Sequence, residues 1–205
     1  MSETHRAPLS VHRLLPSLLG DRATLRLDDA SLDSVIRWCM SGAPATDADR
    51  PARVAGTWFE DATEPKSSFP SDYPCAPVLG PEVRAALGDG LAASGDLVPV
   101  DTGDPEDTGD GAYFLLLVTR VVDCLDVRRS SKPKRSTGEI TRAVFLPEAL
   151  PTAAAAFRVP EAPGAVYWNG WAADLLTARL GDDLESRLCW SEDPARTPHP
   201  DPWGF

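Results

Sequence analysis

The segment "GAVYWNGWAADLLTARLGDDLESRLCW" (164–190) contains the pattern of a strand, a helix and a second strand. Its apolar run "AVYW" is typical of a strand. Asn169 is a suitable N-cap, Trp171 and Leu175 lie on one helical face, and Gly181 ends the helix. The closing run "SRLCW" predicts the next strand. We therefore expect a strand–helix–strand unit here, with the helix near residues 170–180.

An earlier segment, "PVLGPEVRAALGDGLAASGDLVPV" (77–100), has the same pattern and a similar length. Pro81 suits the first turn of a helix, and Gly95 ends it. The sequence therefore predicts an α+β (mixed α/β) fold with a central mixed β-sheet and helices packed against it. The shared pattern suggests two repeated strand–helix–strand units.

Two apolar segments lie between these units. "AYFLLLVTRVVDCL" (112–125) is almost continuously apolar, as in a strand that is buried on both faces. "ITRAVFL" (140–146) follows a basic loop, and we expect it to pair with the first segment as its antiparallel neighbour in the central sheet. "AAFRV" (155–159) is a weaker strand candidate. The helices expected near 81–94 and 170–180 pack on this sheet.

The part of the chain before residue 76 has fewer regular patterns. "SLDSVIRWCMSG" (31–42) predicts a helix and "VAGTWFE" (54–60) a strand. "DATEPKSSFPSDYPCAP" (61–77) is rich in proline and serine, which is typical of a boundary segment. The expected organisation is an N-terminal module, a main domain and a proline-rich tail, at 1–75, 76–190 and 191–205.

Composition and charge narrow the classes of partner. The chain has 205 residues, of which 42% are hydrophobic and 25% charged, and its net charge is −11. Nucleic acids require a basic surface, so we expect no nucleic-acid partner, and a basic protein is a better match. No segment approaches the roughly 18 apolar residues of a membrane span. The first thirty residues are interrupted by Pro16, Gly20 and charges, so we expect no signal peptide and a cytoplasmic location.

The sequence contains few residues that could catalyse a reaction or bind a metal. The four cysteines have no CxxC spacing, and we interpret them as small buried side chains in a reducing cytosol: Cys39, Cys75, Cys124 and Cys189. We expect no catalytic histidine, because the three histidines lie near the chain ends: His5, His12 and His199. Asp123 and Asp126 could form an acid–base or metal pair, or Asp126 could cap a turn. We expect no metal and no cofactor.

Charge is concentrated in two loops on either side of the 112–125 segment. The loop "DTGDPEDTGD" (101–110) contains five acids and no base: Asp101, Asp104, Glu106, Asp107 and Asp110. The segment after Asp126 is rich in arginine and lysine. The two loops either provide separate surfaces for a partner or neutralise one another across a hairpin. Trp168 and Trp171 form a second candidate contact surface, because exposed aromatic residues commonly anchor interfaces.

Part of the chain resembles a known family. "VVDCLDVRRS" (121–130), "AAAFRVP" (154–160) and the segment 164–190 occur in an order similar to that in immunity-protein family eleven of bacterial polymorphic toxin systems, formerly a domain of unknown function. The resemblance covers about residues 76–190. Its most specific residues, with structural roles in the motif, are Asp123, Asp126, Arg128, Ser130, Phe157 and Arg158. Gly80 departs from the serine that is common in the family.

The resemblance implies a protein without enzymatic activity or cofactor. It would bind the toxin domain encoded beside it, one to one, and block or occlude the toxin's active site. The acidic loop then suits a toxin with a basic surface, and our candidate contacts are the five loop acids with Trp168 and Trp171. Two alternatives stay open. One is a regulatory or scaffolding protein for another partner, and the other is a small hydrolase that uses Asp123 and Asp126.

Overall fold

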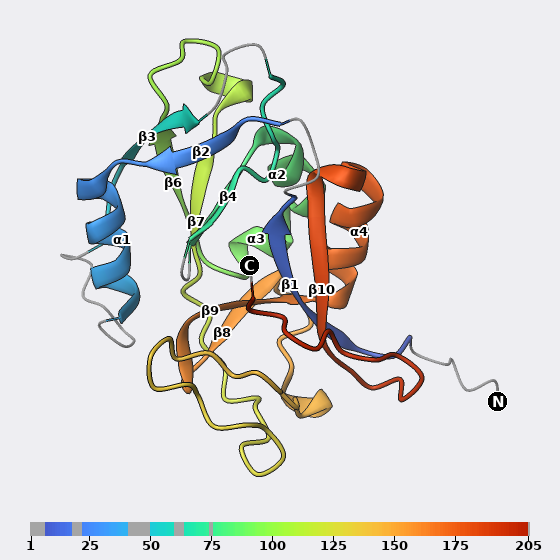
Figure 1. The fold of residues 1–205 in the computed structure, drawn as a ribbon. Coiled ribbons are helices and arrows are strands. Elements are labelled where there is room, and N and C mark those ends of the chain that lie inside the picture. Colours follow the sequence, from blue (N-terminus) through green and yellow to red (C-terminus); the bar gives the residue numbers. More distant parts are fainter. Residues whose placement is uncertain (1–6, 18–21, 41–49, 60–63, 74–75, 205) are drawn as a thin grey trace.

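The computed structural model describes residues 7–17, 22–40, 50–59, 64–73 and 76–204. These residues form an α+β fold with two sheets (Figure 1). The four-stranded sheet contains, in spatial order, β10 (Leu184–Ser191), β1 (Ser10–Pro16), β9 (Ala162–Asn169) and β8 (Ala156–Val159). The six-stranded sheet contains β2 (Thr24–Leu27), β3 (Val54–Phe59), β6 (Asp96–Asp101), β7 (Phe114–Leu117), β5 (Ala76–Leu79) and β4 (Ser71–Tyr73).

Four α-helices accompany the sheets within the described residues: α1 (Asp29–Met40), α2 (Pro81–Leu87), α3 (Asp89–Ala92) and α4 (Gly170–Leu180). The helix expected near 81–94 is therefore divided in two. Gly88 separates α2 from α3 with a φ of 45°, in the left-handed region that glycine adopts without a steric penalty. The mixed fold predicted from the sequence is confirmed.

The two strand–helix–strand units have the same topology. In the first unit β7 lies between β5 and β6 and is antiparallel to both. In the second unit β1 lies between β9 and β10 and is likewise antiparallel to both. The outer strands of each unit therefore run in the same direction and are joined by helices, with one strand inserted between them. The two units that share a sequence pattern therefore also share a topology.

Residues 112–125 and 140–146 were expected to be antiparallel neighbours in the central sheet, and this prediction is wrong. The strand β7 is short, and its neighbours are β5 and β6. After β7 the chain leaves the sheet and follows β8, where Val122 N–H donates to the Arg158 carbonyl at 2.9 Å. Residues 140–146 pack against the end of this segment in the second core, but they pair with it through an isolated antiparallel bridge between Leu125 and Phe145, not as neighbouring strands. The apolar run is long because it passes through two different cores.

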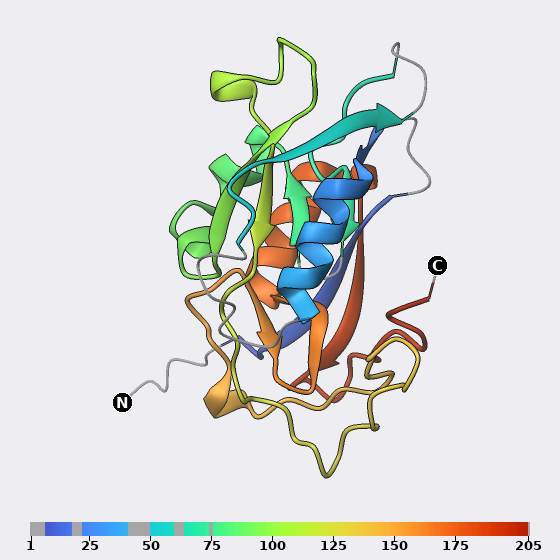
Figure 2. The ribbon, with the colours of Figure 1, turned by 90° about the vertical axis from the view of Figure 1, so that its left-hand side faces the viewer.

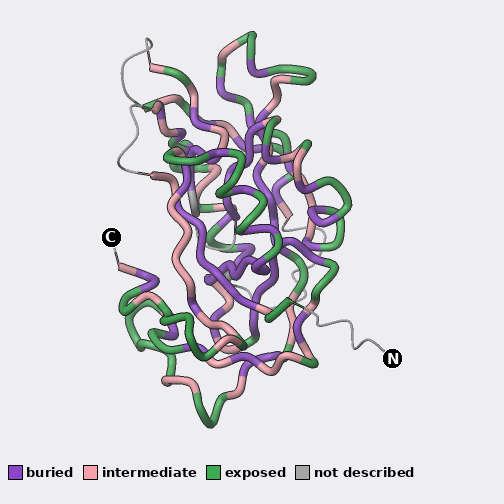
Figure 3. The backbone as a smooth tube through the Cα atoms, turned by 90° about the vertical axis from the view of Figure 1, so that its right-hand side faces the viewer, coloured by how far each residue is buried: buried purple, intermediate pink, exposed green. Residues whose placement is uncertain are grey.

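Those two cores lie on opposite faces of the four-stranded sheet. Because side chains alternate along a strand, β8 and β9 contribute to both. Trp168 belongs to the main core, which joins the two sheets and the helices. Phe157 and Tyr167 belong to the second core, with Phe145 from the 120–150 segment. Figure 3 shows that buried backbone runs through the middle of the molecule and exposed backbone lies mostly at its edges.

The structure does not separate residues 1–75 from the main domain. The strand β1 lies inside the four-stranded sheet, and β2, β3 and β4 belong to the six-stranded sheet. Even the proline- and serine-rich segment contributes to the core, because Phe69 is fully buried and packs edge-on against Trp168 with ring centroids 5.9 Å apart. The described part of this region therefore completes both sheets.

The tail packs back onto the second core. Trp203 is 7% exposed, and its Nε1 donates a hydrogen bond to the Ile140 carbonyl at 3.0 Å. Its ring lies edge-on to Tyr167 with centroids 5.5 Å apart, and the Arg13 guanidinium lies 4.6 Å from its centroid. The proline-rich tail is thus wrapped against the domain and covers one face of the sheet.

The cysteines differ from one another. Cys124 and Cys189 are free and buried, and burial raises the pKa of each thiol to about 12. Cys39 is buried as expected but is disulfide-bonded, so the expectation that it is reduced is wrong. Cys75 lies outside the described residues, as does His5. Within the described residues, no helix is both long and apolar enough to span a bilayer.

Replacing Trp203 tests the structural role of the tail. We expect Trp203→Ala to lower the free energy of unfolding by about 3 to 5 kcal/mol, because the change removes a large buried side chain from the second core. Urea denaturation measures this loss. Trp171→Ala is the matched control, since Trp171 is 41% exposed and should lose much less. Equal losses for the two variants would contradict the role assigned to the tail.

Candidate functional site

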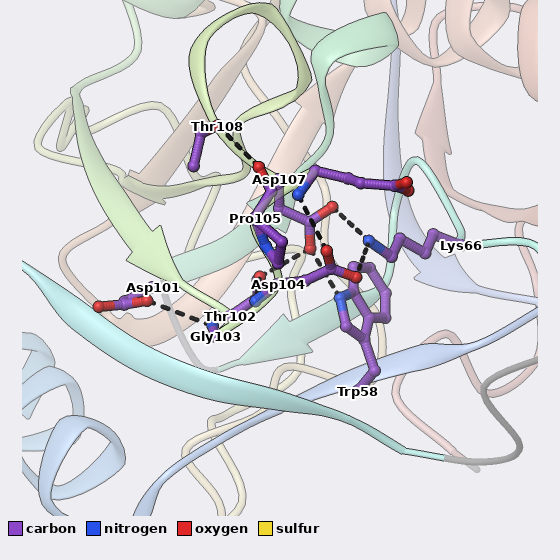
Figure 4. Close-up of polar contacts among 10 residues, drawn as sticks. Trp58, Lys66, Asp101, Thr102, Gly103, Asp104, Pro105, Asp107 and Thr108 are labelled. Atoms are coloured by element: carbon purple, nitrogen blue, oxygen red, sulfur yellow. Dashed lines mark hydrogen bonds and ion pairs between the residues drawn. The ribbon is translucent and has the colours of Figure 1, made fainter.

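The acidic loop 101–110 is organised around a buried carboxylate. Asp107 is 7% exposed, and its Oδ2 accepts hydrogen bonds from Trp58 Nε1 at 2.8 Å and Thr102 Oγ1 at 2.7 Å. Its Oδ1 accepts one from Lys66 Nζ at 2.5 Å (Figure 4). Three donors from β3, the loop itself and the segment before β4 therefore converge on one side chain. Asp107 holds the loop in place and is not available to a partner.

Lys66 connects this carboxylate to a second one. Its ammonium group also donates to Asp104 Oδ2 at 2.8 Å and lies 5.4 Å from the ring centroid of Trp58. Burial lowers the pKa of Lys66, but its hydrogen bonds and charge interactions with Asp104 and Asp107 outweigh burial, so the net pKa is raised. The hydrogen bond from Lys66 holds the pKa of Asp104 below its ordinary value. The cluster is thus a network of three charges rather than an isolated pair.

Only part of the predicted acidic surface is available for binding. Asp101 forms an exposed ion pair with Arg53 at 2.9 Å, and its other oxygen accepts from Gly103 N–H. Among the five loop acids, Glu106 and Asp110 are the exposed ones whose side chains make no hydrogen bond or ion pair in the described structure. Of the five expected contact residues, Glu106 and Asp110 are therefore exposed and unpaired, Asp101 is exposed but ion-paired, and Lys66 engages Asp104 and Asp107.

The Trp168–Trp171 surface also divides into two roles. Trp168 is fully buried in the main core and cannot contact a partner. Trp171 is 41% exposed at the start of α4, and Leu175 is 40% exposed one turn later on the same face. Trp171 Nε1 donates to the Thr152 carbonyl at 3.1 Å, which fixes the ring in an outward position. The exposed apolar surface therefore consists of Trp171 and Leu175.

Asp126 caps a turn, which is one of the two roles considered for it. Its Oδ1 accepts hydrogen bonds from the backbone N–H groups of Arg128 at 3.1 Å and Arg129 at 3.2 Å. Ser130 Oγ accepts from Val144 N–H at 2.9 Å and closes the base of the same loop. The Asp123 side chain is exposed and makes no hydrogen bond or ion pair among the described residues. No contact links the two carboxylates in the part of the chain that the structure describes.

The loop that Asp126 caps is the basic loop, 126–142. It carries five exposed basic side chains that have no carboxylate partner within the described residues: Arg128, Arg129, Lys132, Arg135 and Arg142. Lys134 is paired with Glu139 at 3.2 Å. Figure 1 shows the acidic and basic loops at opposite ends of the molecule. They therefore do not neutralise one another across a hairpin.

Sequence analysis missed the position of His12. This residue lies in β1, where it is 4% exposed. Its Nε2 is 3.1 Å from Ser10 Oγ and its Nδ1 is 2.9 Å from Ser186 Oγ. Burial lowers the pKa of His12 to about 4, with a smaller contribution from Arg196. The imidazole is therefore neutral near pH 7, with both ring nitrogens engaged by serine hydroxyls.

A cavity of about 190 Å³ lies next to this group, at the start of α4. It is lined by Ser10, Asn169, Trp171, Asp174 and Arg196, among other residues. Asn169 is not a side-chain cap for α4, since its Nδ2 donates instead to the carbonyls of Pro151 and Ala154. No side chain caps the helix, and the Asn169 amide fixes the preceding loop.

No protein-family model matches this chain, and no curated protein matches it. In the described residues, no three side chains of His, Cys, Asp or Glu gather where they could hold a metal ion. The interpretation of function therefore rests on the chain's own geometry, and chiefly on the fixed acidic loop.

The hydrogen bonds of Asp107 predict that an isosteric substitution of this residue lowers the stability of the protein. Asp107→Asn keeps the side-chain size but removes the charge that pairs with Lys66, and an amide nitrogen replaces an acceptor. We expect the free energy of unfolding to fall by about 1 to 3 kcal/mol, as for other buried polar groups left unpaired. Chemical denaturation measures it. Asp110→Asn, in the same loop but exposed, should change stability by no more than about 0.5 kcal/mol.

His12 predicts how stability depends on pH. Its folded pKa of about 4 lies below the ordinary histidine pKa of 6.5, so between these values the unfolded chain binds a proton that the folded chain does not. The stabilisation is complete above about pH 6.5 and is lost as pH falls toward 4, by up to about 3 kcal/mol. Denaturation at a series of pH values measures it. His12→Gln should remove this dependence, whereas His199→Gln should retain it.

Proposed function

We propose that the protein is a binding protein of the immunity type, which captures a toxin domain with a basic surface, one to one, and covers its active site. The observation that carries this proposal is the acidic loop, which is fixed from within by Asp107 and presents Glu106 and Asp110 outward. The resemblance of residues 76–190 to immunity-protein family eleven supports the same function.

A fixed loop is well suited to fast and selective binding. Ordering a loop on binding costs conformational entropy, and the contacts of Asp107 with Trp58, Lys66 and Thr102 order this loop in advance. Outward charges at the rim of an interface mainly raise the association rate and select partners of opposite charge. The net charge of −11 extends this attraction beyond the loop itself. An inhibitor that must capture a toxin early benefits from the pre-ordered loop and from the electrostatic attraction.

Trp171 and Leu175 provide a candidate anchor for the complex. Both are large apolar side chains about two-fifths exposed, on one face of α4. Buried aromatic side chains dominate the free energy of many interfaces, whereas rim charges contribute mainly to rates. In this proposal the acidic loop directs the encounter, and the Trp171–Leu175 surface slows dissociation. Trp168 is part of the core and takes no part in binding.

The contacts of Asp126 favour a structural role over hydrolysis. Its carboxylate accepts two backbone N–H groups of the basic loop, a capping role that supports the binding function over the Asp123/Asp126 hydrolase. We place the action of the protein in the cytoplasm, where an immunity protein meets its toxin. The disulfide at Cys39 is more typical of an oxidising compartment, so the cysteines do not support that location.

Binding to the toxin domain encoded by the adjacent gene tests the proposal. The two purified proteins are mixed and their complex is weighed by size-exclusion chromatography with light scattering. We expect a one-to-one complex in which the toxin is inactive, and cells that express both proteins should survive. A toxin that stays active and elutes separately at micromolar concentrations would overturn the proposal.

The acidic loop should control the rate of capture. Glu106→Gln combined with Asp110→Asn is expected to reduce the association rate constant about three- to tenfold at low salt and to flatten its salt dependence, with little change in dissociation. Stopped-flow mixing measures both rates. The control is Asp123→Asn with Glu148→Gln, which removes the same charge from exposed sites outside the loop. Identical association rates for the two double variants would exclude the loop as the steering surface.

A further inference from the structure

The cavity at the start of α4 is open to solvent and has the size of a small ligand. Its volume is about 190 Å³, and its walls come from the start of β1, the start of α4, the segment before β8 and the tail. In Figure 2, α4 lies behind α1 and begins at its lower end, on the side of the start of β1. Drug-sized ligands occupy pockets of about 300 to 1,000 Å³, so this cavity suits a smaller molecule.

One buried acceptor in the cavity has no donor. Asn169 lines the cavity and is 3% exposed, and its Nδ2 donates to the carbonyls of Pro151 at 3.0 Å and Ala154 at 2.7 Å. These two bonds fix the amide in one orientation. Its Oδ1 accepts no hydrogen bond among the described residues, yet it is not fully buried. Because a buried amide oxygen is normally hydrogen-bonded, Oδ1 is an open position for a donor that enters the cavity.

Two opposite charges line the same cavity without neutralising each other. Asp174 lies in α4, and Arg196 lies in the tail. Both are exposed, and neither side chain forms an ion pair or a hydrogen bond within the part of the chain that the structure describes. Elsewhere on the surface, Arg179 is paired with Glu82 at 3.1 Å. The cavity therefore offers one anionic and one cationic group to a ligand.

The first turn of α4 adds donors and an apolar wall. The helix has 11 residues, and no side chain caps it. Its first N–H groups have no acceptor inside the helix, and the positive end of the helix dipole attracts an anion. The hydrogen bond from Trp171 Nε1 to the Thr152 carbonyl, 3.1 Å long, holds the indole ring at the wall of the cavity. Pro8 and Leu9 extend this apolar surface.

We propose that this cavity binds a free α-amino acid. The ammonium group of the ligand contacts the Asp174 carboxylate and Asn169 Oδ1, and its carboxylate contacts the Arg196 guanidinium at the first turn of α4. The side chain of the ligand lies against Trp171. A ligand with a single charge would leave one charged group of the cavity unpaired, so both ends of the amino acid are needed. The site does not depend on the toxin partner proposed above, and it is tested on the chain alone.

Isothermal titration calorimetry of the full chain with glycine, L-leucine and L-phenylalanine tests the proposal. We expect at least one of them to bind one to one with a Kd of about 1 mM or lower. The N-acetyl derivative of the best ligand lacks the ammonium group, and its amide lacks the carboxylate. Each derivative should bind about tenfold more weakly, because one set of charged hydrogen bonds is lost. No binding of the three amino acids at about 10 mM, or equal binding of the best ligand and both derivatives, would overturn the proposal.

Two variants assign each end of the ligand to a residue. Asp174→Asn should lose the preference for the amino acid over its N-acetyl derivative but keep the preference over its amide. Arg196→Gln should show the reverse. Both residues are exposed, so both variants should fold as the wild type does. This exchange of preferences distinguishes direct contacts with the ligand from a general loss of structure.

Matched controls remove the same charges from exposed positions outside the cavity. Asp182→Asn and Arg135→Gln are suitable, and both should bind the amino acid as the wild type does. Unchanged preferences in Asp174→Asn and Arg196→Gln would place the binding elsewhere on the protein and exclude this cavity as the site.

Discussion

The four-stranded sheet buries both of its faces, and most of the other features of the molecule follow from that constraint. One face packs in the main core, where it meets the six-stranded sheet and the helices. The other face is apolar too, through side chains such as Phe157 and Tyr167, so it needs a second cover. The 120–150 segment and the tail provide it. Segments with little regular structure are therefore as necessary to the fold as the helices.

In each charged loop at the ends of the molecule, one aspartate accepts several hydrogen bonds and helps to hold the shape of the loop. Asp107 is buried and receives bonds from Trp58, Lys66 and Thr102. Asp126 is at the surface and receives bonds from two backbone N–H groups of its own turn. Asp107 and Asp126 were candidate functional residues in the sequence, but in the structure their carboxylates hold the conformation of the loops. The side chains that face solvent are their neighbours in the loops, such as Glu106 and Arg128.

Local patterns predicted the local elements well. Both strand–helix–strand units, α1 and the strand at 156–159 follow from periodicity, caps and glycine stops, which act over a few residues. The expected hairpin was wrong because continuous apolarity shows that a segment is buried but not which neighbour buries it. The strand β1 was overlooked for a related reason, since its neighbours β9 and β10 are distant in the sequence.

The candidate site was predictable only in part, for the same physical reason. The concentration of acids at 101–110 is visible in the sequence, but the contact between Lys66 and Asp107, 41 residues apart, is not. The burial of Trp168 beside the exposed Trp171 depends on where the strand ends and the helix begins.

The position of β1 has a consequence for how the chain is made. His12 and Ser186, whose side chains meet across β1 and β10, are 174 residues apart in sequence. A ribosome therefore releases β1 long before either of its neighbours exists, and until then its backbone has unpaired N–H and C=O groups on both sides. Contacts this distant slow folding and favour association between incomplete chains. A chain that stops short of β10 therefore retains an open edge on β1, which can pair with other chains.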